Sequence, residues 1–518
     1  MDSNVTPTDH VEATKAADKP TYGQILRSSS ILGGATALSY LIAMGRTKAV
    51  ALLLGPAGIG MVSLFQSLVT LVGTVSGLGV ASSGVREVAE AYGANDAERL
   101  AKISRTVIRL SWIIGLLGWI LTAALSYPLA VWSLKSGEHA LAVIILGASL
   151  VFTTVASVQL AVIQGMRRIG DLARLQVATM LVSTVIDIGL YAWLREKGIV
   201  PVLMVNAMLT FAGSWLVSSR VRHVEVTLTW QQTFKESRRL ISFGVAFTWS
   251  AVLGAAVALA TRSIITRELG VESNGIFQSA WGISGMFAGF ILAAMGTDFY
   301  PRLSAASNDH ALMNRLVNEQ TEVGILLALP GLLGTMVFAP LVMKIFYSTK
   351  FLGGAELLPW FVLGVFFKII SWPLGFIQLA KGENRWFALS ETVFGVCHLG
   401  LTIVLLKTSG LPGASHAFAL AYAGYILGML AISKTLSGFT WSRETVNLLV
   451  KAGLIVITAF FLQHFLNQPA ALLAGILLCI ISGIISLRGI SQRLGNDHRV
   501  VRLMVRIPGS RLLFWRAI

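Results

Sequence analysis

Long apolar runs separated by short polar connections dominate the chain. A helix that crosses a bilayer needs about 20 mostly apolar residues, and fourteen segments meet this requirement. They lie at 29–50, 58–80, 107–133, 140–163, 175–194, 200–218, 241–264, 276–298, 323–346, 356–379, 387–406, 412–433, 449–466 and 470–487. The pattern therefore predicts an all-α, polytopic membrane protein with about fourteen transmembrane helices.

The composition supports a membrane protein. Of the 518 residues, 55% are hydrophobic and only 13% are charged, whereas a soluble domain has about 25% charged residues. The mean hydropathy is +0.72, which excludes a soluble globular domain and a disordered chain. The two cysteines, Cys397 and Cys479, lie far apart in apolar segments. We therefore expect no disulfide framework, no metal site and no cofactor.

The distribution of basic residues predicts the orientation. The net charge is +16, and most of the 41 Lys and Arg residues fall in the N-terminal tail, the C-terminal tail and the connections after even-numbered spans. Cytoplasmic connections carry the excess of basic residues, so both termini are predicted to be cytoplasmic. Basic residues placed between apolar runs do not indicate a nucleic-acid partner. The opposite connections are too short for a separate catalytic domain, and no enzymatic activity is expected.

The first half of the chain recurs in the second half. Leu54-Gly55 followed by Gly60 matches Leu269-Gly270 followed by Gly275. Further matches at a nearly constant offset pair Gly73 and Gly77 with Gly285 and Gly289, Asn95-Asp96 with Asn308-Asp309, Pro128-Leu129 with Pro340-Leu341, and Gly165 and Arg168 with Gly382 and Arg385. An even number of predicted helices, six, separates the copies, so the repeats are parallel. We expect two six-helix lobes around a central cavity, plus two accessory helices.

This organisation predicts six consecutive parts. They are a disordered cytoplasmic tail (1–25), an N-lobe (26–219), a cytoplasmic linker between the lobes (220–240), a C-lobe (241–434), accessory spans (435–487) and a basic cytoplasmic tail (488–518). In the last part, Arg499, Arg502 and Arg506 alternate with apolar residues. That pattern fits either an amphipathic helix on anionic lipid or a tail that only fixes the topology.

Five cations lie at membrane depth: Arg46 and Lys48 in the first span, Arg262 and Arg267 in the seventh, and Lys368 near the middle of the tenth. A charge near the bilayer centre costs about 2.5–3.5 kcal/mol on insertion scales, so each needs a wet cavity or a partner. A cationic cavity wall would attract an anionic substrate such as a phosphate. The alternatives are extension to the outer interface for the first four and a structural ion pair for Lys368.

Other polar groups in the spans have two explanations each. Asp298, Asp187 and Glu391 are candidates for ion or proton coupling, or for structural pairing. Gln66, Gln278 and Gln378 are candidates for contacts to sugar hydroxyls, although hydrogen bonds between helices explain them equally well. The sequence has no Walker-type phosphate loop and no zinc-protease motif. We therefore expect secondary transport without ATP hydrolysis.

Three stretches resemble a known family. They are Lys48 with the following AVALLLGPAGIG, FYPRLS at 299–304, and TKFLGGAELLPWFVLGVFFKIISWPLGFIQLAKGENRWFALSE at 349–391. They resemble bacterial O-antigen translocases, which are lipid-linked oligosaccharide flippases of the multidrug/oligosaccharidyl-lipid/polysaccharide exporter superfamily. The branch that moves the enterobacterial common antigen lipid intermediate looks most similar. The chain departs from the usual twelve spans by its N-terminal tail and two extra spans.

The resemblance implies a function and a place. It implies that an undecaprenyl-pyrophosphate-linked oligosaccharide moves from the cytoplasmic to the periplasmic leaflet of a bacterial inner membrane, by alternating access. It implies a basic cavity onto which Lys48, Arg262 and Lys368 map. Membrane lipids, a polysaccharide polymerase and a chain-length regulator are the partners it implies. Two alternatives stay open: a cation-coupled multidrug or small-molecule antiporter of the same superfamily, and a membrane glycosyltransferase or ligase.

Overall fold

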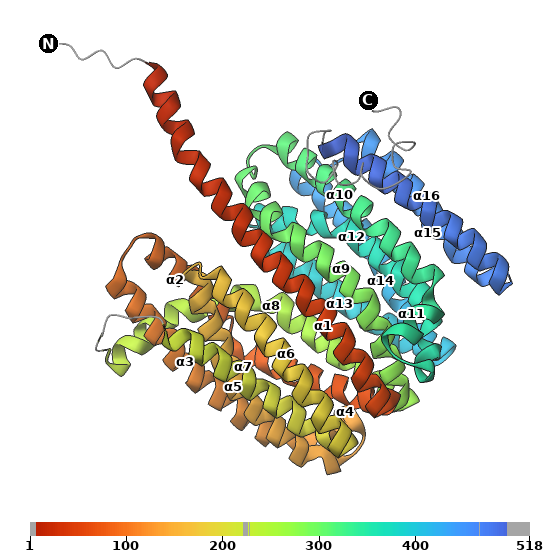
Figure 1. Cartoon of the computed structure of the whole chain (residues 1–518), viewed down its shortest axis with the longest axis horizontal. Coiled ribbons are helices and arrows are strands. Elements are labelled where there is room, and N and C mark those ends of the chain that lie inside the picture. Colours follow the sequence, from red (N-terminus) through yellow and green to blue (C-terminus); the bar gives the residue numbers. More distant parts are fainter. Residues whose placement is uncertain (1–6, 221–225, 227, 466, 495–518) are drawn as a thin grey trace. The chain divides into compact units, whose positions relative to one another are not determined.

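A computed structural model of the chain describes residues 7–220, 226, 228–465 and 467–494 (Figure 1). The side chains of 7–33, 464, 468 and 494, and of some residues between 234 and 298, lie outside this description. The α-helices are α1 (Pro7–Gly77), α2 (Val80–Gly93), α3 (Ala97–Ala124), α4 (Ser126–Leu134), α5 (Ala140–Gly165), α6 (Ile169–Leu194), α7 (Ile199–Ser219), α8 (Trp230–Leu269), α9 (Val271–Ala305), α10 (His310–Val337), α11 (Ala339–Phe346), α12 (Leu358–Ala380), α13 (Asn384–Ser409), α14 (Pro412–Ser437), α15 (Arg443–Phe465) and α16 (Gln468–Leu494). Three short 3₁₀ turns join them: η1 (Gly137–His139), η2 (Arg195–Gly198) and η3 (Thr349–Ala355).

Helix covers all or most of each of the fourteen predicted spans, so the all-α, polytopic class is confirmed. Within the described part of the chain, eleven segments are long and apolar enough to cross a membrane. Two of these, Gly34–Gly77 and Ile169–Ser219, contain 44 and 51 residues. Each is about twice the length of one crossing and covers most or all of two predicted spans. The sequence predicted a disordered tail over 1–25, and this is wrong from Pro7 onward, where the helix α1 begins. The helix forms because residues 11–19 are rich in Ala, Glu and Lys, which favour helix.

The predicted duplication is visible in the backbone. Gly55 interrupts α1 with φ 67° and ψ −172°, and its repeat match Gly270 precedes α9 with φ 91° and ψ 165°. Only glycine adopts such angles readily. The matched residues Asp96 and Asp309 are the N-caps of α3 and α10, and their carboxylates accept hydrogen bonds from the backbone N–H groups of Arg99 at 2.9 Å and Leu312 at 3.0 Å. The same sequence signals thus produce the same turns in both halves.

Two predicted spans are interrupted helices, and they are equivalent in the repeat. The segment 107–133 breaks at Leu125 between α3 and α4, and the segment 323–346 breaks at Phe338 between α10 and α11. Pro128 and Pro340 lie in the first turns of the helices that follow. Proline fits there because the first N–H groups of a helix have no partner within it. The repeated Pro-Leu pair therefore marks a new short helix in each half.

By its contacts the chain forms two compact units. The first comprises 1–53, 68–131 and 136–248, and the second comprises 54–67, 132–135 and 249–518. In the first unit, apolar residues of α2, α3 and α5 form a buried cluster that includes Val88, Val107 and Val162. In the second, residues of α9, α10, α12 and α14 form a cluster that includes Leu303, Met313 and Leu374. The boundaries predicted for the lobes and their arrangement around a central cavity stay predictions.

Within the second unit, the repeated glycines Gly60 of α1 and Gly275 of α9 lie against each other. A Cβ atom on Gly60 would lie 2.1 Å from the carbonyl oxygen of Val271, and one on Gly275 would lie 1.8 Å from that of Pro56. Buried Asn274 donates to the Gly60 carbonyl at 2.9 Å. The repeat match found by sequence thus marks a helix crossing that no larger residue allows.

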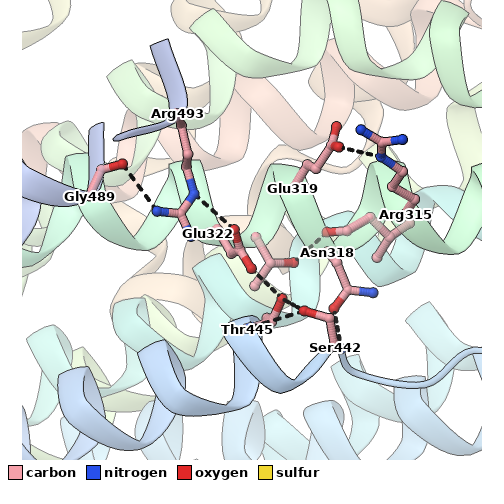
Figure 2. Close-up of polar contacts among 10 residues, drawn as sticks. Arg315, Asn318, Glu319, Glu322, Ser442, Thr445, Gly489 and Arg493 are labelled. Carbon is pink, nitrogen blue, oxygen red and sulfur yellow. Dashed lines mark hydrogen bonds and ion pairs between the residues drawn. The ribbon is translucent and has the colours of Figure 1, made fainter. Parts of the chain in front are cut away.

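The accessory helices α15 and α16 pack against each other and against α10. Figure 2 shows the polar contacts that hold them. Glu322 of α10 accepts a hydrogen bond from the Thr445 hydroxyl at 2.6 Å and forms an ion pair with Arg493 of α16 at 2.5 Å. One turn earlier, Asn318 donates to the Thr440 carbonyl at 3.2 Å and accepts from the Ser442 N–H at 2.9 Å. Since only 7% of the Glu322 side chain is exposed, this is a buried attachment.

The first unit has an equivalent attachment with a different chemistry. Arg105 of α3 donates to the Val226 carbonyl at 2.5 Å. Arg109 donates to the Leu228 carbonyl at 2.9 Å, and its guanidinium lies 5.0 Å from the ring of Trp230. The capping residues Asp96 and Asp309 define the spacing between the two copies of the repeat. At the same spacing, Arg105 and Arg109 match Asn318 and Glu322. The first residue of α8 likewise matches the first residue of α15. The helix α15 therefore follows the second half as α8 follows the first.

Candidate functional site

A cavity of about 320 Å³ lies in the second unit and is lined by residues of α12, α13 and α14. Two of its lining residues are charged: Lys368 of α12 and Glu391 of α13. The sequence had assigned them separate roles, as a substrate-binding cation and as a coupling carboxylate. The fold brings both into one cavity, because α12 and α14 pack closely and α13 covers them.

Hydrogen bonds hold Glu391 in place from two other helices. One carboxylate oxygen accepts from the Tyr425 hydroxyl at 2.7 Å, and the other accepts from the Ser250 hydroxyl at 3.1 Å. Hydrogen bonds to a charged acceptor are stronger than those between neutral groups. The carboxylate is therefore fixed at the wall of the cavity rather than free to rotate.

The ammonium group of Lys368 lies 5.8 Å from the centroid of the Tyr422 ring. At that distance the negative face of the ring attracts the cation. Among the residues that the structure describes, the ammonium forms no hydrogen bond and no direct ion pair, and Glu391, the other charge of the cavity, acts on it through space. Three N–H donors thus remain available in the cavity.

Aromatic rings form much of the remaining wall. Trp372 and Phe376, one turn apart on α12, meet edge to face at 4.5 Å. Phe394 of α13 lies 4.7 Å from Tyr422 and 4.8 Å from Tyr425 of α14. Such tilted pairs prefer fixed geometries, so the rings hold one another in position. The cavity therefore combines apolar faces with one cationic donor group and one anionic acceptor group.

The two other predicted site cations of the second unit, Arg262 and Arg267, have partners. Buried Arg262 donates twice to the Gln278 side-chain carbonyl, at 2.8 and 3.0 Å, and once to the Ala258 carbonyl at 2.9 Å. Two predicted site residues with different roles thus contact each other. Arg267 donates to the Trp132 carbonyl at 2.9 Å, and its own carbonyl accepts from Lys135.

In the first unit, Arg46 of α1 forms an ion pair with Asp187 of α6 at 3.2 Å, and Asn206 of α7 donates to the same carboxylate at 3.0 Å. Only 2% of the Asp187 side chain is exposed, against 29% for Arg46. Again two residues with separate predicted roles are neighbours. The carboxylate is paired, and the guanidinium keeps an accessible side.

Three further predicted site residues, Gln378, Gln66 and Lys48, are not among the residues that line the cavity. Fully buried Gln378 donates to the Met429 sulfur at 3.4 Å and accepts from the Ser390 hydroxyl at 3.3 Å. Gln66 of α1 is exposed and Lys48 is partly buried. Asp298 lies in α9, but its side chain is outside the described residues. Hydrogen bonding between helices is thus what the structure shows for Gln378 and Gln278.

These features define the class of protein: a multi-pass membrane protein made of two related halves, with charged groups inside its helical bundles. The chain matches the family of polysaccharide biosynthesis proteins over residues 49–356. Since this is more than half of the chain, the protein belongs to that family.

Two curated relatives are similar over most of their length. A probable low-salt glycan biosynthesis flippase of Haloferax volcanii is 21% identical over 78% of this chain and 83% of its own length. The lipid III flippase of Escherichia coli is 20% identical over 75% of this chain and 94% of its own length. Both relatives are named as flippases.

Solved structures share the fold. The lipid II flippase MurJ in an inward closed conformation has a TM-score of 0.69 and 16% identity, covering 89% of this chain and 99% of that one. An inward-facing multidrug resistance transporter of the MATE family and MOP superfamily has a TM-score of 0.61 and 18% identity, covering 77% of this chain and 95% of that one. The chain therefore shares its fold with these two transporters.

Proposed function

We propose that the protein is a flippase that moves a lipid-linked oligosaccharide across a bacterial inner membrane. The substrate is an undecaprenyl-pyrophosphate-linked repeat unit of O-antigen or a related surface glycan, transferred from the cytoplasmic to the periplasmic leaflet by alternating access. The observation that carries this proposal is membership of the polysaccharide biosynthesis family over 49–356. The flippase names of the two curated relatives support it. The excess of basic residues on one side supports cytoplasmic termini.

The cations at membrane depth are the proposed contacts for the pyrophosphate. Arg46 keeps an accessible side beside Asp187, and Lys48 is partly buried on the same helix. Arg262 uses three of its five N–H groups in the hydrogen bonds described above, so two remain for an anion. Arg267 belongs to the same proposed set, and Asp187, Glu391 and Asp298 are the proposed coupling carboxylates.

A polysaccharide polymerase and a chain-length regulator are the proposed functional partners, because they would act on the glycan after it reaches the periplasmic leaflet. The antiporter remains the second candidate, since the MATE-family structure shares the fold. The family match and the flippase relatives favour the first candidate.

A deletion strain tests the proposal. We expect the strain to accumulate lipid-linked oligosaccharide on the cytoplasmic leaflet and to lose surface glycan, and the wild-type gene to reverse both effects. Normal surface glycan together with increased drug sensitivity would instead support the antiporter. Transfer of sugar to an acceptor by the purified protein would support the glycosyltransferase.

A further inference from the structure

The charged groups that line the cavity of the second unit are one cation and one anion, and this limits which ligands the cavity can bind. Its lining contains one ammonium, from Lys368, and one carboxylate, from Glu391. A pyrophosphate carries more than one negative charge, and Glu391 would repel it in surroundings where water screens poorly. One ammonium does not balance the charge of a diphosphate, and a fixed carboxylate beside it opposes its binding. The chemistry of this cavity therefore differs from that of the cations proposed for the headgroup.

The polar groups suit a ligand that both donates and accepts hydrogen bonds. Lys368 offers N–H donors that no described residue uses. The Glu391 carboxylate has about four lone-pair positions, of which Tyr425 and Ser250 occupy two. A hydroxyl group matches both partners, since it accepts from the ammonium and donates to the carboxylate. Several hydroxyls on one small ring would satisfy both walls.

The apolar part of the wall fits the same kind of ligand. Trp372, Phe376 and Tyr422 line the cavity beside the two charges. Ligand sites combine apolar and aromatic walls with a few placed polar groups, and a sugar ring offers apolar C–H faces between its hydroxyls. The volume of about 320 Å³ is at the lower end for small-molecule sites. It is too small for a whole oligosaccharide or a long lipid tail.

We propose that this cavity binds one uncharged sugar residue, with Lys368 and Glu391 as the hydrogen-bonding groups and Trp372 as an apolar wall. This inference rests on the proposed function only in taking the sugar as part of the transported glycan. It assigns Lys368 to the sugar rather than to the pyrophosphate. It gives the second unit its own contact with the substrate, separate from the headgroup.

The test uses the purified full-length protein in detergent and free ligands as probes. Glucose, galactose, N-acetylglucosamine and inorganic pyrophosphate are titrated separately, and binding is followed by tryptophan fluorescence. We expect saturable binding of at least one neutral sugar, and loss of its signal in Trp372→Phe. Glu391→Gln and Lys368→Met should each weaken that sugar at least tenfold. Lys381→Gln, at the C-terminal end of the same helix, is the matched control and should bind like wild type.

Two results would overturn the inference: no neutral sugar saturates, or pyrophosphate binds and Lys368→Met abolishes that binding. Tyr425→Phe removes only one hydroxyl from the Glu391 wall, so it replaces Glu391→Gln if that variant does not fold. The deletion strain separates the two proposals. If flipping is established and no sugar binds, only the sugar site fails. If a sugar binds and the deletion leaves lipid-linked glycan unchanged, the proposed function fails and the site stands.

Discussion

At the residue scale, the most informative polar contact of the first unit is the ion pair between Arg46 and Asp187. The Asp187 carboxylate is almost fully buried, and Arg46 and Asn206 are its partners. A buried charge that loses its partner is strongly destabilising, because its desolvation is no longer offset. The pair therefore matters to the stability of the unit, whatever it contributes to transport.

Replacing Arg46 alone should destabilise the protein more than replacing Arg46 and Asp187 together. Arg46→Met leaves a buried carboxylate without its cation, and we expect the thermal midpoint to fall by about 5 °C. Adding Asp187→Asn removes that charge and keeps a group that can bond Asn206, so part of the loss should return. Differential scanning fluorimetry of both variants measures this. Equal midpoints for Arg46→Met and wild type would contradict the pairing.

The sequence could identify these residues but not their partners. Lys368, Glu391, Arg46 and Asp187 stand out because charges are costly at membrane depth. Their pairing depends on how helices rotate and pack, and Arg46 and Asp187 lie on helices that are far apart in the chain. The aromatic wall was missed as well. The spacing of Lys368, Trp372 and Phe376, one helical turn each, is the one signal that pointed to a shared face.

At the element scale, the repeated residues of the sequence mark turns that occur in both halves. Gly55, Gly270, Asp96 and Asp309 fix turns through local backbone chemistry, which a sequence shows directly. The attachment of α15 could not be foreseen in this way. Its contacts use arginines in the first half and an asparagine and a glutamate in the second, so no residue match reveals the equivalence.

The crossing of Gly60 and Gly275 gives a prediction about packing. Gly275→Ala would place a methyl group against the backbone of Pro56, and backbone cannot move aside as a side chain can. We expect the purified yield to fall at least several-fold and the thermal midpoint to drop. Gly285→Ala in the same helix, where no atom lies within 4 Å of the added Cβ, is the control. If both variants behave like wild type, the close crossing is wrong.

The ion pair of Glu322 and Arg493 gives a prediction about α16. Arg493→Met leaves buried Glu322 with only its Thr445 hydrogen bond. We expect faster amide hydrogen exchange throughout α15 and α16, with little change in α12 to α14. Hydrogen exchange with mass spectrometry measures this. The control is Arg315→Gln, which breaks the exposed ion pair with Glu319 on α10. Exposed ion pairs contribute less than about 1 kcal/mol to stability, so α15 and α16 should exchange at the wild-type rate in this variant. Equal exchange in both variants would show that the ion pair does not hold α16.

At the scale of the whole molecule, the protein has two related halves and belongs to the polysaccharide biosynthesis family over 49–356. The apolar pattern was enough to predict the membrane class, and matched glycine, proline and Asn-Asp positions at a constant offset predicted the duplication, because span length and repeat spacing are properties of the chain itself. The proposed division between cations for the headgroup and a cavity for one sugar could be drawn only from the structure. That proposal depends on which charged side chains have partners in the folded protein, and the sequence alone does not show these partners.

The most direct test of the account is a leaflet assay with the purified protein. Liposomes are prepared with the protein and a fluorescent undecaprenyl-pyrophosphate-linked glycan, and a membrane-impermeant quencher is added outside. Without nucleotide, we expect the protein to bring the inner-leaflet glycan lipid within reach of the quencher, while a labelled phospholipid of the same leaflet stays protected. If glycan lipid in these liposomes stays as protected as in protein-free ones, the protein is not the flippase proposed here.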